Sequence, residues 1–80
     1  MLTPTQCKMA RIALDWGVRE LADATGLNVN TVSRFESGKK ANATTPKLIR
    51  QAFEAAGVLF IDADETADEG VRLKKKEASE

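Results

Sequence analysis

The segment VRELADATGLNVNTVSRFES, residues 18–37, decides the fold because it places two helical patterns on either side of a glycine. Residues 18–25 form the first pattern, in which four side chains recur on one helical face: Val18, Leu21, Ala22 and Thr25. Gly26 ends that helix because glycine adopts positive φ at little cost. Asn28 is a suitable N-cap for a second helix over residues 29–36. The segment therefore predicts two short helices joined by a tight turn.

The second predicted helix has an inward and an outward face. Val32 and Phe35 lie three residues apart and point inward. They close a local core with Leu21 and Leu27, while Ala22 is small where the two helices must approach. The other side chains are polar and point largely elsewhere: Asn30, Thr31, Ser33 and Arg34. One face of this helix is therefore free to contact another molecule.

The N-terminus carries the signals of a preceding helix. Thr3 is a suitable N-cap, Pro4 suits the first helical position, and Gln6 can complete a capping box with Thr3. We predict a helix over residues 4–15, with Gly17 as its stop.

A fourth helix is predicted after the loop GKKANATT. The Thr45-Pro46 pair repeats the cap-then-proline signal, and the helix should run to about Ala56, with Gly57 as its stop. Trp16 falls between the first two helices, so we expect it in the core rather than as a platform for stacking bases.

Beyond Gly57 the pattern changes to that of a β-hairpin. Residues 58–61 read VLFI, residues 62–69 are an acidic turn, and residues 71–73 alternate apolar with charged. A two-stranded hairpin is marginal alone, so it must pack on the helices or pair with a second copy. The last residues, 74–80, look like a solvated, flexible tail.

Composition limits the class of protein. Eighty residues allow one domain with a modest core, and 42% hydrophobic with 30% charged residues is typical of a globular chain. With no run of roughly 20 apolar residues and no secretory signal, we expect a cytoplasmic protein without membrane contact. The chain has no histidine, and we expect the single cysteine, Cys7, to be a core residue. We expect no cofactor and no metal, since the acidic run lacks a calcium-loop pattern and is more typical of a solvated turn.

The net charge of zero hides an asymmetry. Residues 1–50 carry eight lysines and arginines against four acidic residues, a net charge of +4, whereas residues 51–80 carry four against eight, a net charge of −4. A basic front suits a protein that turns one face toward a polyanion. An enzyme is not expected, because the chain lacks histidine, a phosphate-binding glycine loop and a carboxylate pair in an evident cleft.

Residues 18–37 resemble the helix-turn-helix of the phage-repressor (Cro/XRE) family of bacterial and phage regulators. The fifth motif position is alanine and the ninth is glycine, while the fourth, tenth, fifteenth and eighteenth are aliphatic or aromatic. The phrases AFEAAGVLFI and GVRLKK also look like those of short members that end in a hairpin. The resemblance implies a mainly α, four-helix, lambda-repressor-like domain over residues 1–57, followed by a hairpin. From the residues themselves, we expect residues 58–73 to be a dimerisation element and residues 74–80 a flexible tail.

The resemblance also implies which residues face DNA, because the third helix of this family lies in the major groove. The positions carried over as base-reading are Val29, Asn30, Ser33 and Arg34. Arg34 can bind guanine O6 and N7, and Asn30 can pair with adenine N6 and N7. Ser33 suits several bases, and Val29 can touch a thymine methyl. The expected phosphate contacts are Arg19, Thr31, Ser37, Lys39, Lys40, Asn42 and Thr44.

Two further positions compare with the family. Members often carry glutamine at the first motif position, where it contacts a phosphate, whereas this chain has Val18 and offers Arg19 as a substitute. Members also often pair an arginine late in the first helix with a glutamate at the end of the third. Here that structural ion pair would be Arg11 and Glu36.

We predict a sequence-specific DNA-binding regulator of transcription that binds double-stranded DNA, at a palindromic or repeated operator, as a homodimer. The expected dimer interface is the hairpin: Val58, Phe60, Val71 and Leu73. RNA polymerase or another regulator is a further candidate partner, and no small-molecule effector is evident. The alternative is a protein-interaction module of the same fold, antitoxin-like or polymerase-contacting, without strong DNA specificity. Residues 74–76 suit either a DNA-backbone arm or a solubilising tail.

Overall fold

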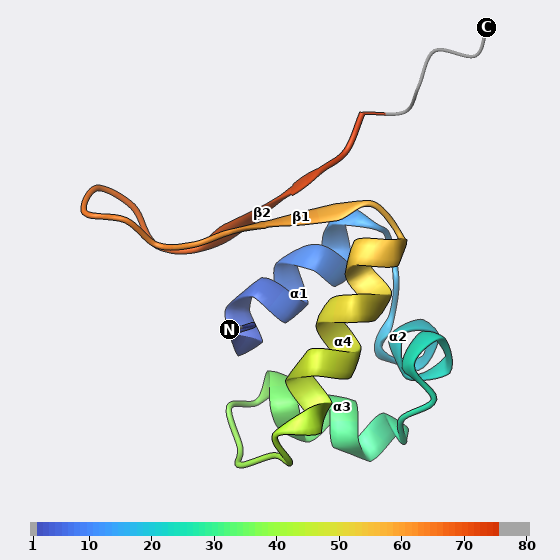
Figure 1. The fold of residues 1–80 in the computed structure, drawn as a ribbon. Coiled ribbons are helices and arrows are strands. Elements are labelled where there is room, and N and C mark those ends of the chain that lie inside the picture. The colour runs from blue at the N-terminus through green and yellow to red at the C-terminus, as the bar shows by residue number, and fades with distance from the viewer. Residues whose placement is uncertain (1, 76–80) are drawn as a thin grey trace, which may run out of the picture.

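The computed structural model describes residues 2–75 and contains four helices followed by a two-stranded antiparallel hairpin. The elements are α1 (Pro4–Ala13), α2 (Val18–Thr25), α3 (Val29–Glu36), α4 (Thr44–Ala55), β1 (Val58–Ile61) and β2 (Gly70–Leu73). The hairpin lies across one end of the helical domain, and α3 lies at the opposite end (Figure 1). The predicted mainly α fold with a C-terminal hairpin is confirmed.

One hydrophobic core joins all four helices to the first strand. Its fully buried large side chains are Phe53, Leu21, Ile49, Val32 and Val58. Each contributes roughly 1.5–3 kcal/mol by leaving water. Trp16 is half-buried and packs against this core with its ring 5.7 Å from that of Phe53, so it lies at the edge of the predicted core.

The helix-turn-helix has the turn that its sequence predicts. Gly26 has φ of 76°, and its N–H donates to the carbonyl of Ala22 at 2.8 Å. The Asn28 side chain then accepts from the N–H of Asn30 at 2.8 Å and caps α3. Two local hydrogen bonds thus fix the angle at which α3 leaves α2.

The end of α1 differs from the prediction. The left-handed residue is Asp15, with φ of 60°, and not Gly17, which precedes α2 with φ of −84°. The N–H of Trp16 donates to the carbonyl of Arg11 at 2.8 Å, and that of Asp15 donates to Ile12 at 3.0 Å. These are the two bonds of a Schellman motif, which aspartate can adopt at a modest cost. The motif ends α1 two residues before the predicted boundary.

The predicted cap of α4 is wrong. The helix begins at Thr44 after Ala43, and no side chain caps it. Thr45 is buried inside the first turn, and Pro46 is tolerated there because the first N–H groups of a helix have no intrahelical acceptor. The capping box of α1 is confirmed, since Gln6 N–H donates to Thr3 Oγ1 and Thr3 N–H donates to Gln6 Oε1, both at 3.1 Å.

The hairpin is held on the helices by Gln6. Its buried amide Nε2 donates to the carbonyls of Ile61 at 3.2 Å and Gly70 at 3.1 Å, at the loop end of the two strands. Thr3 Oγ1 also donates to Glu69 at 3.0 Å. The Gln6 side chain therefore both completes the cap of α1 and holds the hairpin against this helix.

The strands alternate between a covered and an open face. Val58 pairs with Leu73 and Phe60 pairs with Val71, so these side chains share the face that packs on the helices. Leu59 and Ile61 lie on the opposite face and are exposed. Of the predicted tail, Lys74 and Lys75 are described, whereas Lys76 and residues 77–80 lie outside the described residues.

Candidate nucleic-acid interface

The outward face of α3 carries the predicted base-reading residues. Val29, Asn30, Ser33 and Arg34 are all exposed, whereas Val32 and Phe35 of the same helix are buried. Positions 29, 30, 33 and 34 lie on adjacent turns of one helical face. They offer one apolar contact, one amide, one hydroxyl and one guanidinium, a set that can read base edges in a major groove.

A hollow of about 340 Å³ lies beside this face, between α3 and the loop that leads to α4. It gathers five of the predicted DNA-contacting residues: Thr31, Arg34, Lys40, Asn42 and Thr44. Leu27, Ala41 and Thr45 complete its lining. Two cations and three neutral hydrogen-bonding side chains therefore surround one concave surface, which suits a phosphate group.

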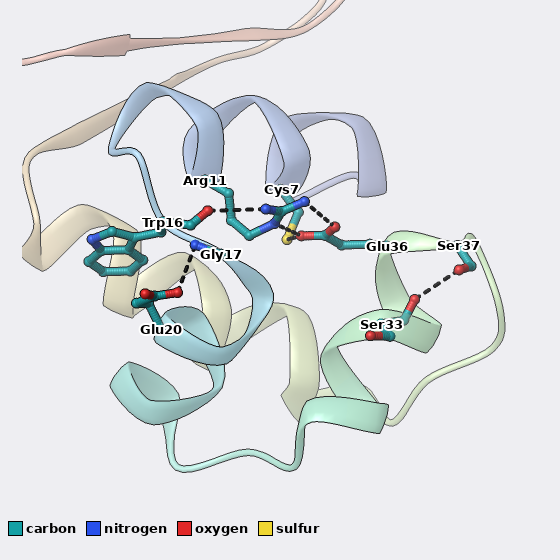
Figure 2. A network of polar contacts seen from close by, with 8 residues as sticks. All are labelled: Cys7, Arg11, Trp16, Gly17, Glu20, Ser33, Glu36 and Ser37. Carbon is teal, nitrogen blue, oxygen red and sulfur yellow. Dashed lines mark hydrogen bonds and ion pairs between the residues drawn. The ribbon is translucent and has the colours of Figure 1, made fainter.

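The end of α3 fixes the basic loop to the recognition helix. Gly38 has φ of 80°, its N–H donates to Phe35, and the N–H of Lys39 donates to the carbonyl of Arg34, both at 3.0 Å. This second Schellman motif places the first lysine of the loop directly after the outward face of α3. The Ser37 hydroxyl donates to the Ser33 carbonyl at 2.9 Å, so its proton is engaged within the helix (Figure 2).

The start of α2 offers one exposed cation. Arg19 is exposed in the first turn, whereas Val18 is half-buried and packs against the core. The Gly17 N–H donates to Glu20 at 2.8 Å, which fixes this helix start. Arg19 does not line the hollow, so it lies apart from Lys40, the other predicted phosphate contact of this comparison.

Arg11 and Glu36 form an ion pair between α1 and the end of α3. Arg11 Nε donates to Glu36 Oε2 at 2.6 Å, and Nη2 donates to Oε1 at 3.0 Å. Their side chains are only 18% and 8% exposed. The hydrogen bonds to Glu36 raise the pKa of Arg11, so the guanidinium stays charged. This two-point contact holds the last turn of α3 against α1.

Two members of this network were not predicted. Arg11 Nη1 also donates to the carbonyl of Trp16 at 3.1 Å, and the Cys7 thiol donates to Glu36 Oε2 at 3.2 Å (Figure 2). Burial, followed by the bond to Glu36, raises the pKa of Cys7, so the thiol stays protonated. Spacing along the chain gives no signal for either contact, because the first depends on how the chain turns after α1 and the second on how α1 meets α3.

The predicted dimer residues are mostly engaged within their own chain. Val58 is only 1% exposed, and Phe60 and Val71 are half-buried against the core. Leu73 alone of the four is well exposed. Because strand residues alternate, the apolar side chains that remain open on the strand's other face are Leu59 and Ile61 instead.

The basic end of the hairpin lies far from the recognition helix. Figure 1 places the end of β2, from which Lys74 and Lys75 continue, across the molecule from α3. These two lysines therefore do not extend the surface formed by α3 and its loop. Within residues 2–75, no three histidine, cysteine or acidic side chains are grouped to hold a metal ion. Over the same range, no helix is both long and apolar enough to span a bilayer.

Comparison with known proteins identifies the domain. The helix-turn-helix family HTH_3 matches residues 8–53, which run from α1 into α4 and cover more than half of the chain. No curated protein matches the chain. The matched region includes the ion pair, the turn and the whole outward face of α3. The chain therefore belongs to the HTH_3 family of XRE/Cro/C1-type helix-turn-helix domains, which are non-enzymatic DNA-binding domains of transcriptional regulators.

Proposed function

We propose that this chain is a sequence-specific regulator of transcription that binds a palindromic or repeated operator as a homodimer, with α3 in the major groove. The observation that carries the proposal is the division of α3 into a buried face and an exposed face. Val32, Phe35 and Glu36 anchor the helix. The exposed face that remains for bases carries Val29, Asn30, Ser33 and Arg34. In a dimer, two such helices would enter successive major grooves about 34 Å apart.

Phosphate contacts on both sides of α3 would set its register. Arg34 and Lys40 share the hollow, Lys39 follows the end of α3, and Arg19 lies at the start of α2. Lys39, Lys40 and Arg19 would supply affinity that falls as salt rises, without reading sequence, while Arg34 beside Lys40 would reach a base. The Ser37 hydroxyl would have to leave its bond to Ser33 before donating to a phosphate, so we rank it below the lysines.

Selection of bound sequences from random DNA tests the proposal. The wild-type chain should enrich a symmetric or repeated motif, and Arg34→Ala should lose preference at one base position, at a cost of about 1–3 kcal/mol. Lys47→Ala is the control, because Lys47 is an exposed cation on α4 with no predicted base contact. Uniform weakening by Arg34→Ala would make Arg34 a phosphate contact.

A titration with DNA at several salt concentrations distinguishes this function from a protein-interaction module. The logarithm of the binding constant should fall linearly with the logarithm of salt, with a slope of about −0.9 for each phosphate neutralised. The double variant Lys39→Ala, Lys40→Ala should reduce that slope by about two if each lysine contacts one phosphate. Binding that ignores salt, or no binding at all, would contradict the proposal.

A further inference from the structure

The two edges of the hairpin differ in how open they are. The Lys74 N–H donates to the Gly57 carbonyl at 2.8 Å, which makes residues 57 and 74 a hydrogen-bonded pair of the ladder. Hydrogen-bonded and non-hydrogen-bonded pairs alternate in an antiparallel ladder. The backbone N–H and C=O groups of residues 58, 60, 71 and 73 therefore point toward the free edges. On β1, Val58 is buried and the Arg50 guanidinium lies 5.0 Å from the centre of the Phe60 ring. On β2, Leu73 is 47% exposed. The side chains at this end of the hairpin are therefore covered on β1 and exposed on β2.

The charges along β2 and the residues beside it are complementary to those of a second, antiparallel copy of the same segment. Asp68 and Glu69 precede the uncharged pair Gly70 and Val71, and three cations follow: Arg72, Lys74 and Lys75. An antiparallel copy of this strand with Val71 at the axis would place Lys74 opposite the partner's Asp68, and the cationic end of each strand beside the acidic end of the other. A parallel copy in register would place like charges together, which is destabilising.

We propose that a second copy of this chain pairs antiparallel with the free edge of β2, around a two-fold axis near Gly70 and Val71. The inference rests on the proposed homodimer and specifies its edge, its direction and its register. With the axis at Val71, Lys74 stands opposite Asp68 of the partner subunit, and the reverse pair follows by symmetry. The two hairpins then form one four-stranded sheet.

This arrangement also orients the recognition helices. A two-fold axis perpendicular to the joined sheet keeps both helical domains on the same side of it. Because α3 lies at the far end of each domain from the hairpin, both copies of α3 would face the same direction (Figure 1). The helix that packs beneath β2 is α1, and it exposes Met9 and Ile12, so two copies that approach along this edge have further apolar surface to cover.

The charge pair can be tested because one chain cannot satisfy it alone. Asp68 and Lys74 are six residues apart, about 20 Å along an extended strand, whereas the Debye length is about 8 Å at physiological salt. Both side chains are exposed, and neither has a hydrogen-bond partner among residues 2–75, so their reversal should leave the fold intact. Exchanging them should therefore affect only association.

Sedimentation equilibrium of the full chain measures the effect. Asp68→Lys and Lys74→Glu should each weaken the dimer by on the order of tenfold, because two symmetric pairs become repulsive. The double variant Asp68→Lys, Lys74→Glu should recover the wild-type dissociation constant. The matched control is Asp23→Lys with Lys47→Glu, an exposed pair on α2 and α4 outside the hairpin, which should change nothing.

Three results would overturn the inference. Single reversals that leave the dimer unchanged, or a double variant no better than the weaker single one, would remove this register while leaving a homodimer in place. A wild-type chain that stays monomeric at high concentration would remove both the register and the homodimer. DNA binding by the monomer would still be measurable in the salt titration, so the failures can be told apart.

Discussion

The helix-turn-helix unit and the hairpin differ in how much apolar surface each leaves exposed. Leu21 of α2 and Val32 of α3 are completely buried, and the outward side of α3 is mainly polar, with Val29 as its one large apolar side chain. In the hairpin Val58 is just as buried, yet Leu59, its neighbour in sequence, is 44% exposed. The helical unit is complete within one chain. The hairpin leaves an apolar face and an open strand edge, which is the usual condition of a surface that gains from a partner.

The largest expected effect is on the helical unit. Glu36→Ala would leave the Arg11 guanidinium mostly buried without its carboxylate, at a cost of about 3–5 kcal/mol. The midpoint of thermal unfolding should fall by at least about 10 °C in a domain of this size. Circular dichroism during heating measures this change.

A control for that variant exists in the same chain. Glu54 forms an ion pair with Arg50 at 3.0 Å, but both side chains are exposed, so Glu54→Ala should cost less than about 1 kcal/mol. Equal losses from the two substitutions would mean that burial does not set the value of the Arg11–Glu36 pair.

The next effect concerns the attachment of the hairpin. Gln6→Ala removes the bonds to the Ile61 and Gly70 carbonyls and the acceptor for the Thr3 N–H, so we expect a loss of about 1–3 kcal/mol. Gln51→Ala is the control, because Gln51 is exposed on α4. Hydrogen exchange should show faster opening of β1 and β2 with little change in α3. Uniform acceleration across the chain would instead mean that hairpin and helices unfold as one unit.

A smaller effect depends on pH. The raised pKa of Cys7 keeps the folded thiol protonated, whereas an unfolded thiol ionises near pH 8.5. Above that pH the unfolded state binds fewer protons than the folded state, so the free energy of unfolding should fall by about 1.4 kcal/mol per pH unit. Below pH 8 this contribution is fully present.

Denaturant unfolding between pH 7 and 9.5 checks this dependence, and Cys7→Ala is the comparison, because it should remove the slope that the thiol causes. A slope that persists in Cys7→Ala would assign the pH dependence to other groups.

The smallest effect should come from the open face of the hairpin. Leu59→Thr should change the free energy of unfolding of the monomer by less than about 0.5 kcal/mol. Val58→Thr, one residue earlier, buries a hydroxyl in the core and should cost about 1–3 kcal/mol. Chemical denaturation below the dimer dissociation constant measures both. Similar values for the two would contradict the alternation between a covered and an open face.

Much of this fold could be predicted because local rules determine it. Gly26 and Asn28 define the turn, and the spacing of Val32 and Phe35 defines the buried face of α3. The role of Thr45 could not be predicted, since tertiary packing buries it inside the first turn of α4. Asp15 is exposed and takes the left-handed conformation in place of the glycine that local preference favours. The same limit applies to the hairpin, where the sequence shows alternation but not which face the helices cover. Gln6 was predicted only as a cap, although it also binds the hairpin.

Two neighbouring residues of α1 reach the two ends of the molecule. Gln6 binds the hairpin, while Cys7 bonds to Glu36 at the end of α3. In a hairpin-linked dimer, the length and position of α1 would therefore set the distance between the two recognition helices. Operators with a different half-site spacing would then be selected by changes in α1 and its two contacts. Insertions in the loop between α3 and α4 would alter affinity and leave the spacing unchanged.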